Sequence, residues 1–251
     1  MTQTQSLSPS SIDAGEIERF AKLADGWWDP KGAFRPLHQL NPVRLTFIRD
    51  RLCRHFDRDP KAKRPLAGLR LLDIGCGGGL VAEPMARLGA EVVGIDAAEQ
   101  NVSVAQLHAR QMRLSIDYRV STAEALLAAD ERFEAVLTLE VVEHVADMDL
   151  FIAAAAGLVK PEGAMVAATL NRTAKAFAFA ILGAEYLLGW LPRGTHSWAK
   201  FVRPSELDAA LRRSGMRLTE LSGMSYSPLG DAWRLSRDLD VNYLGFAVKA
   251  G

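Results

Sequence analysis

The sequence predicts an α/β fold with a doubly wound, mostly parallel seven-stranded sheet, N-terminal helices and a helical insertion after the fifth strand. Two observations support this prediction. From Leu69 onward, short apolar runs alternate with segments of helical periodicity, and the first run leads into the glycine-rich turn Gly75–Gly79. The runs expected to form strands are Leu69–Ile74, Glu91–Ile95, Ile116–Val120, Phe133–Leu139, Ala164–Leu170, Met216–Leu221 and Tyr243–Val248.

Helices are predicted between these strands and before them. Those between strands are Gly79–Leu88, Ala98–Gln111 and Asp147–Val159. Before the first strand, one helix is expected around Ile17–Ala24 and another over Pro42–Phe56, with Pro42 near its first turn. Near the end of the chain, the segment Ser205–Asp208 resembles a capping box that opens a helix, and Gly215 ends that helix.

The chain length suits one large domain with small additions, because domains usually contain about 100–200 residues. We expect a flexible N-terminus over residues 1–15 and a single domain over residues 16–251. Within that domain, residues 16–68 are expected to form a helical cap. Residues 172–203 are expected to form an apolar lid.

The composition excludes several classes of protein. Thirty basic and thirty acidic residues leave no net charge, so no general electrostatic drive toward nucleic acid exists and none is expected as a partner. Two cysteines without a metal-type spacing favour a reducing compartment and no disulfide framework. The first eleven residues lack the basic start and apolar run of a signal peptide, which favours the cytoplasm.

The turn after the first strand is typical of a cofactor site. Glycines such as Gly75 and Gly77 let a backbone bend sharply and approach a ligand closely, and the following helix offers free N–H groups. The segment Gly77–Ala82 also satisfies the G-x-G-x-x-A pattern of dinucleotide-binding proteins. An NAD(P)-dependent oxidoreductase is therefore one interpretation of the turn.

Two carboxylates favour a different ligand. Asp73 lies at the end of the first strand, where it would repel a pyrophosphate but attract the ammonium of a methionyl group. Asp96 lies at the end of the second strand, where a carboxylate accepts hydrogen bonds from both ribose hydroxyls. Together they predict a nucleoside that carries an amino acid.

The sequence L-L-D-I-G-C-G-G-G at 71–79, followed by V-V-G-I-D at 92–96, resembles the Rossmann-like class I S-adenosylmethionine methyltransferases. More narrowly, the chain resembles the ubiquinone biosynthesis O-methyltransferases over nearly its whole length after residue 15. The marks of that subfamily are W-W-D-P at 27–30, N-P-V-R-L at 41–45 and D-V-N-Y at 240–243.

The resemblance implies O-methylation of two polyprenylated intermediates, 2-polyprenyl-6-hydroxyphenol and 3-demethylubiquinol. It further implies that Arg44, Gly75, Asp96 and Leu139 contact S-adenosylmethionine, with Arg44 holding the methionyl carboxylate. Leu139 stands where relatives carry methionine, a conservative change for packing against the adenine. Other enzymes of the pathway are candidate partners.

A cluster after the fourth strand contains the candidate catalytic residues Glu140, Glu143 and His144. In a helix, these three would share one face. His144 is the candidate general base for a phenolic hydroxyl. Glu140 and Glu143 would orient it or, together with it, bind a divalent cation such as Mg²⁺ that holds both catechol oxygens. The alternative is a solvated first turn of a helix, in which the helix dipole favours the two acids and the histidine only caps the turn.

The segment 174–191 is apolar on nearly every side but too short and too charged to span a bilayer. Basic residues and tryptophan near its ends suit an interfacial helix that touches lipid, which would place the protein peripherally on the inner face of the membrane. A buried helix that caps the substrate pocket is the other interpretation. A catalytically silent membrane-binding scaffold remains an alternative to an enzyme.

Overall fold

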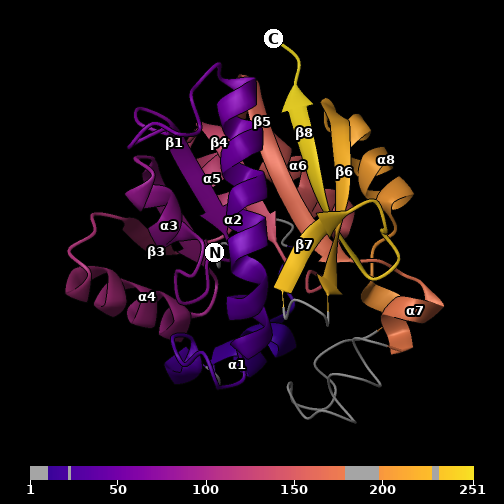
Figure 1. Cartoon of the computed structure of the whole chain (residues 1–251), viewed down its shortest axis with the longest axis horizontal. Coiled ribbons are helices and arrows are strands. Elements are labelled where there is room, and N and C mark those ends of the chain that lie inside the picture. Colours follow the sequence, from indigo (N-terminus) through magenta and orange to yellow (C-terminus); the bar gives the residue numbers. More distant parts are fainter. Residues whose placement is uncertain (1–10, 22–23, 179–197, 228–231) are drawn as a thin grey trace, which may run out of the picture.

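The computed structural model describes residues 11–21, 24–178, 198–227 and 232–251. In this part of the chain, eight strands form one sheet in the order β3-β2-β1-β4-β5-β8-β6-β7 (Figure 1). The strands are β1 (Arg70–Ile74), β2 (Glu91–Asp96), β3 (Asp117–Val120), β4 (Phe133–Leu139), β5 (Val159–Leu170), β6 (Met216–Ser227), β7 (Ala232–Ser236) and β8 (Asn242–Lys249).

The doubly wound prediction is confirmed. Strands β3, β2, β1, β4 and β5 are neighbours in parallel pairs, and β8 lies antiparallel between β5 and β6. The eighth strand, β7, was not predicted. It pairs antiparallel with the end of β6, which extends beyond the expected end at Leu221 to Ser227. Because β7 is a partly exposed edge strand, it lacks the continuous apolar run that marks the central strands.

Helices cover both faces of the sheet. They are α1 (Ala14–Ala21), α2 (Arg35–His55), α3 (Ala82–Arg87), α4 (Glu99–Gln111), α5 (Ala123–Ala128), α6 (Met148–Leu158), the short α7 (Ala174–Ala176) and α8 (Pro204–Arg213). In Figure 1, α2 crosses the front of the sheet and α6 lies behind it. Short 3₁₀ turns at Ala24–Gly26 and Trp198–Lys200 complete the described elements.

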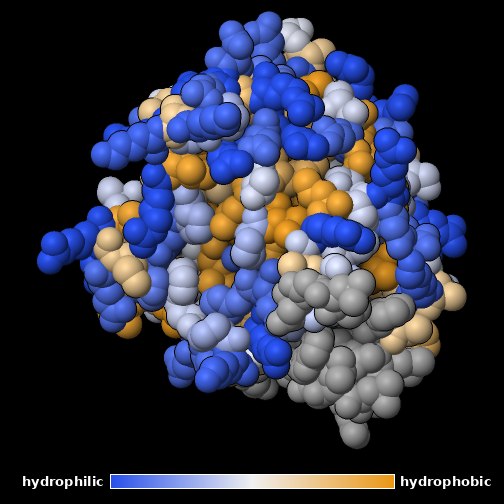
Figure 2. All heavy atoms as spheres, in the orientation of Figure 1, coloured by the Kyte–Doolittle hydropathy of each residue, from blue (hydrophilic) through white to orange (hydrophobic). Residues whose placement is uncertain are grey.

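The two largest hydrophobic cores of the described residues lie one on each face of the sheet. Successive strand residues point to opposite faces, so Leu71 packs with α2, α3 and α4, and Leu72 packs with α5, α6 and α8. Phe47 of α2 and Ile152 of α6 are fully buried in these respective cores. Figure 2 shows apolar residues beside α2 at the centre of the front face, with hydrophilic residues around them.

The second helix begins earlier than predicted. It starts at Arg35 with Pro36 in its first turn, so Pro42 lies inside the helix although it cannot donate a backbone hydrogen bond. Tertiary contacts offset this loss, because Leu40 is buried in the front core and Asn41 Nδ2 donates to Leu80 O at 3.1 Å. Burial of Leu40 and Asn41, just before Pro42, therefore outweighs the local tendency of proline to end a helix.

Two other boundaries differ from the sequence predictions. The first helix begins at Ala14, and Ser11 before it is already buried, so ordered structure starts ahead of residue 16. The last helix begins after Arg203, whose backbone N–H donates to Glu206 Oε2 at 2.9 Å. The N-cap residue is therefore Arg203, two positions before the expected Ser205, and the Glu206 side chain caps its backbone N–H.

Replacing Phe47 by alanine should destabilise the protein by about 3–5 kcal/mol, because the change leaves a cavity in a fully buried core. Chemical denaturation followed by circular dichroism would measure the free energy of unfolding. The control is Leu107→Ala, since Leu107 is among the exposed large apolar residues. Similar losses in both variants would contradict this description of the core.

Candidate active site

A cavity of about 280 Å³ opens at the carboxyl ends of β1, β2 and β4. Here the strand order reverses, because the chain proceeds outward from β1 to β3 on one side and from β4 to β5 on the other. Ligands of open α/β sheets bind at this reversal, outside the carboxyl ends of the strands. The predicted residues that line the cavity are Arg44, Asp73, Gly75, Gly77, Asp96, Leu139, Glu140 and His144.

The glycine turn forms one wall of the cavity and requires its glycines. Gly75 and Gly77 have φ values of 69° and 52°, which L side chains rarely adopt. A Cβ atom at Gly75 would lie 2.5 Å from Val141, and one at Gly77 would lie 2.4 Å from Trp27. Both positions therefore exclude any larger residue.

The tryptophan pair, which the sequence offered only as a mark of a subfamily, packs on this turn. Trp27 Nε1 donates to Asn101 Oδ1 at 2.9 Å, and Trp28 Nε1 donates to Gly78 O at 2.9 Å. The Trp27 ring also stacks on Phe34, with centroids 3.8 Å apart. The N-terminal segment thus covers the turn from outside the sheet.

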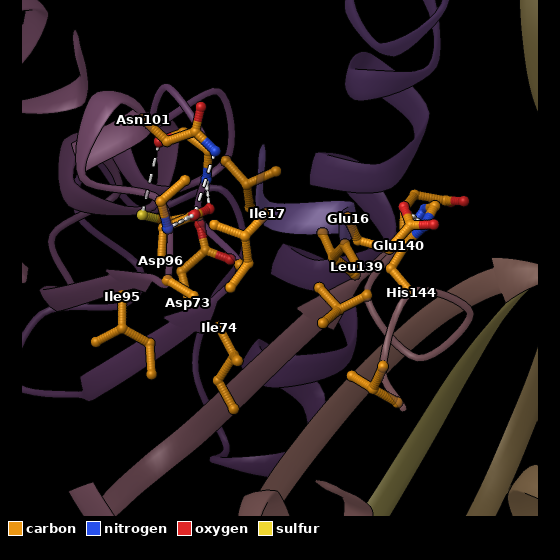
Figure 3. Close-up of a pocket in the computed structure, with 18 of the residues that line it drawn as sticks. Glu16, Ile17, Asp73, Ile74, Ile95, Asp96, Asn101, Leu139, Glu140 and His144 are labelled. Carbon is orange, nitrogen blue, oxygen red and sulfur yellow. Dashed lines mark hydrogen bonds and ion pairs between the residues drawn. The ribbon is translucent and has the colours of Figure 1, made fainter. Parts of the chain in front are cut away.

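Asp96 joins the glycine turn to the end of β2. Its carboxylate accepts hydrogen bonds from Gly77 N at 3.0 Å, Ala98 N at 2.8 Å and Asn101 Nδ2 at 3.2 Å (Figure 3). Two carboxylate oxygens offer about four acceptor positions, so the group can still accept from a ligand hydroxyl. Burial raises the pKa of Asp96, and these donors oppose that rise.

At the cavity, the buried groups Asp73 and Arg44 each have an atom without a hydrogen-bond partner among the described residues. Asp73 is 3% exposed, and its Oδ2 has no hydrogen-bond partner within the described residues. Arg44, also 3% exposed, pairs with Glu140, but its Nε has no partner among those residues either. Burial, followed by the nearby charge of Asp96, raises the pKa of Asp73 to about 7. An ammonium and a carboxylate on one ligand would satisfy Asp73 and Arg44 respectively.

Residues 140–144 do not form the helical turn that would align the three predicted catalytic side chains. Glu140 has a left-handed φ of 55°, and His144 N donates to Val141 O at 2.8 Å in a tight turn. Glu143 is buried outside the cavity, where its Oε2 accepts from Thr169 Oγ1 at 2.8 Å. Burial and the adjacent Glu140 carboxylate hold the pKa of Glu143 well above its usual range, which favours its neutral form.

His144 is oriented by a residue that the sequence analysis missed. Its Nδ1 lies 3.0 Å from Glu16 Oε2, so neither Glu140 nor Glu143 takes the orienting position expected for it. Figure 3 shows Glu16 and His144 on the opposite side of the view from Asp73 and Asp96. Glu16 lies 128 residues before His144, and no local pattern in the sequence signals their contact.

The predicted divalent-cation site does not fit this arrangement. Glu140 pairs with Arg44 and His144 with Glu16, while Glu143 accepts from Thr169 and lies next to Glu140, so the three side chains do not converge on one position. Over the described ranges, no group of three histidine, cysteine, aspartate or glutamate side chains has a geometry that could hold a metal ion. A cation would require these side chains to leave their present partners.

The apolar segment 174–191 lies mostly outside the described residues, which include it only as far as residue 178. Its described start, α7, has Thr173 as its N-cap, with Thr173 Oγ1 accepting from Ala176 N at 3.0 Å. No helix in the described ranges combines the length and apolar character needed to cross a bilayer.

Comparison with known proteins identifies the family. A family model described as a methyltransferase domain matches residues 72–167, from β1 through most of β5. Among solved structures, magnesium protoporphyrin IX methyltransferase from Synechocystis with bound SAM superposes with a TM-score of 0.62. That match covers 97% of this chain and 100% of the other at 16% identity, and it shows the shared fold.

Sequence relatives are more specific. A ubiquinone biosynthesis O-methyltransferase of Chelativorans sp. is 58% identical over 240 residues, which cover 96% of this chain and 95% of the relative. A protein with the same name from Brucella anthropi is 58% identical over 249 residues, which cover 99% of both chains. At that identity and coverage, this chain belongs to the ubiquinone biosynthesis O-methyltransferase family.

Proposed function

We propose that this protein transfers a methyl group from S-adenosylmethionine to a phenolic hydroxyl of polyprenylated ubiquinone precursors. The proposed acceptors are the two that the sequence resemblance implies, 2-polyprenyl-6-hydroxyphenol and 3-demethylubiquinol. The names of the relatives support O-methylation in ubiquinone biosynthesis. The observation that carries the proposal is the pair of buried, incompletely partnered groups Asp73 and Arg44 at one cavity. Neither a nicotinamide dinucleotide nor a scaffold role accounts for a carboxylate and a guanidinium placed in this way.

Each cavity residue has a role in holding the methyl donor. Asp73 binds the ammonium of the methionyl group, and Arg44, held by Glu140, binds its carboxylate. Asp96 accepts from the ribose hydroxyls, while Leu139 supplies apolar surface for the adenine. Gly75 and Gly77 let the backbone come close to the ligand.

The chemistry requires a base and an aligned acceptor. The bound cofactor supplies a methyl group on a positively charged sulfur. As the acceptor oxygen bonds to the methyl carbon, the carbon–sulfur bond breaks, its electron pair stays on sulfur, and the hydroxyl proton passes to His144. His144 lines the same cavity as the residues that hold the donor, so this cavity can both bind the methyl donor and remove the proton of the acceptor. Glu140 and Glu143 act through Arg44 and Thr169, respectively, rather than as bases.

We also propose that residues 172–203 form a lid that touches lipid and places the enzyme peripherally on the inner membrane face. Phe177 and Trp198, near the two ends of the described chain there, are 39% and 42% exposed. Nearby Lys175 and Lys200 pair with Asp238 and Asp13, so apolar contact rather than free positive charge supports the proposal. Because the prenyl chain makes the acceptor apolar, contact between the lid and lipid would bring the enzyme to its acceptor.

Methyl transfer should depend on His144. His144→Gln should lower kcat by about 100-fold or more while the affinity for S-adenosylhomocysteine stays unchanged, because the base acts only during the reaction. Labelled-methyl assays with short-chain analogues of both acceptors, with and without a chelator, would measure this. His55→Gln, outside the cavity, is the control. Full turnover in His144→Gln would remove His144 as the base, and absent transfer by the wild-type protein would overturn the proposed activity.

Cofactor affinity should rise with pH toward neutrality. Asp73, with a pKa of about 7 in the free protein, must be ionised to hold an ammonium, so protonation competes with binding as pH falls. The affinity for S-adenosylhomocysteine should fall by up to about tenfold per pH unit below 7. Calorimetry between pH 5.5 and 7.5 would measure it, and Asp73→Asn should bind weakly with a flatter pH profile. A flat wild-type profile would contradict the role of Asp73.

The lid proposal is tested by flotation with anionic liposomes. Deleting residues 174–191, or combining Phe177→Glu with Trp198→Glu, should reduce the bound fraction, because each change removes apolar surface. Retained binding of S-adenosylhomocysteine would establish that the variants are folded. Equal flotation of the folded variants and the wild-type protein would exclude this membrane contact.

A further inference from the structure

Helix α1 brings a carboxylate to the candidate base. Glu16 Oε2 lies 3.0 Å from His144 Nδ1, although α1 and the turn after β4 are far apart in the sequence (Figure 3). Glu16 is 18% exposed and His144 is 13% exposed, so the pair is largely shielded from water. A hydrogen bond between partly buried, charged groups is stronger than one in open solvent.

The segment around Glu16 is held from several directions. Ser11, just before α1, donates its N–H to Glu124 Oε1 at 3.1 Å, and its carbonyl accepts from Ala146 N at 2.7 Å. Lys200 Nζ lies 2.8 Å from Asp13 Oδ2 and 3.6 Å from Glu16 Oε1. These contacts attach the backbone around Glu16 to three other parts of the chain, at Glu124, Ala146 and Lys200.

The contact has a chemical consequence for the imidazole ring. A carboxylate oxygen can only accept a hydrogen bond, so Nδ1 of His144 must carry the hydrogen in this pair. The ring nitrogen that takes up a proton is then Nε2. A carboxylate next to a catalytic histidine sets the tautomer and orientation of the ring in other enzymes.

We propose that Glu16 is a positioning residue for methyl transfer, which sets the tautomer and orientation of His144. This inference rests on the proposed role of His144 as the base. Because Glu16 belongs to α1, His144 is complete as a base only when α1 is seated over the cavity.

Steady-state kinetics provide the first test. Glu16→Gln keeps the shape of the side chain but removes its charge, and should lower kcat by about 10- to 100-fold. The KM for S-adenosylmethionine should change little. Asp13→Asn is the matched control, because it weakens the same tie to Lys200 and can still accept from Gly15 N and Glu16 N at the start of α1. A loss of kcat equal to that of Glu16→Gln in this control would assign Glu16 a purely structural role.

Combining variants separates this inference from the proposed function. In a His144→Gln background, Glu16→Gln should cause no further loss, because it acts through His144. If His144→Gln alone keeps full turnover, the proposed base fails. If His144→Gln loses turnover while Glu16→Gln keeps it, the inference about Glu16 alone is overturned.

Nitrogen-15 NMR of the histidine side chains reads the tautomer directly. The signal of His144, identified by its absence in His144→Gln, should show a protonated Nδ1 in the wild-type protein at a pH where the ring is neutral. Glu16→Ala should shift it toward the Nε2-protonated form, while Asp13→Asn should leave it unchanged. An identical tautomer in the wild-type protein and in folded Glu16→Ala would contradict the positioning role.

Discussion

The hydrogen bond from Gly77 N to Asp96 Oδ2 connects the turn after β1 to the end of β2, and the cavity depends on it. Through the same carboxylate, Asp96 holds Asn101, and Asn101 accepts from the Trp27 indole. Trp27 then packs so closely on the turn that a side chain at Gly77 would collide with it. One carboxylate therefore organises both the turn and the segment that covers it.

The electrostatics of the cavity suit a ligand that carries both charges of an amino acid. Asp73 is buried with an unmatched oxygen, which makes its ionised form costly until a cation arrives. Arg44 is already held by Glu140, and its Nε remains without a described partner. A bound zwitterionic group supplies the missing partners of both Asp73 and Arg44. The two side chains are already removed from water in the folded protein, so ligand binding does not have to desolvate them.

Much of the fold and of the cofactor site was predictable from the sequence because short-range patterns determine both. The alternation of apolar strands with helices indicates a parallel sheet, and its reversal point follows from strand order. Asp73, Gly75 and Asp96 lie at strand ends, so their meeting at one edge follows from the topology. The helical turn that would align the side chains of residues 140–144 is absent, because local spacing cannot reveal the left-handed backbone at Glu140 or its pairing with Arg44.

The sequence by itself determined the sheet, the glycine turn and the acids at the strand ends, because each depends on residues close together in the chain. Only the tertiary structure decided which side chains surround the candidate base. It paired Glu140 with Arg44 and Glu143 with Thr169, and placed Glu16 beside His144. The physical reason is that α1 reaches the cavity through long-range contacts, such as Ser11 with Glu124, that no local pattern encodes.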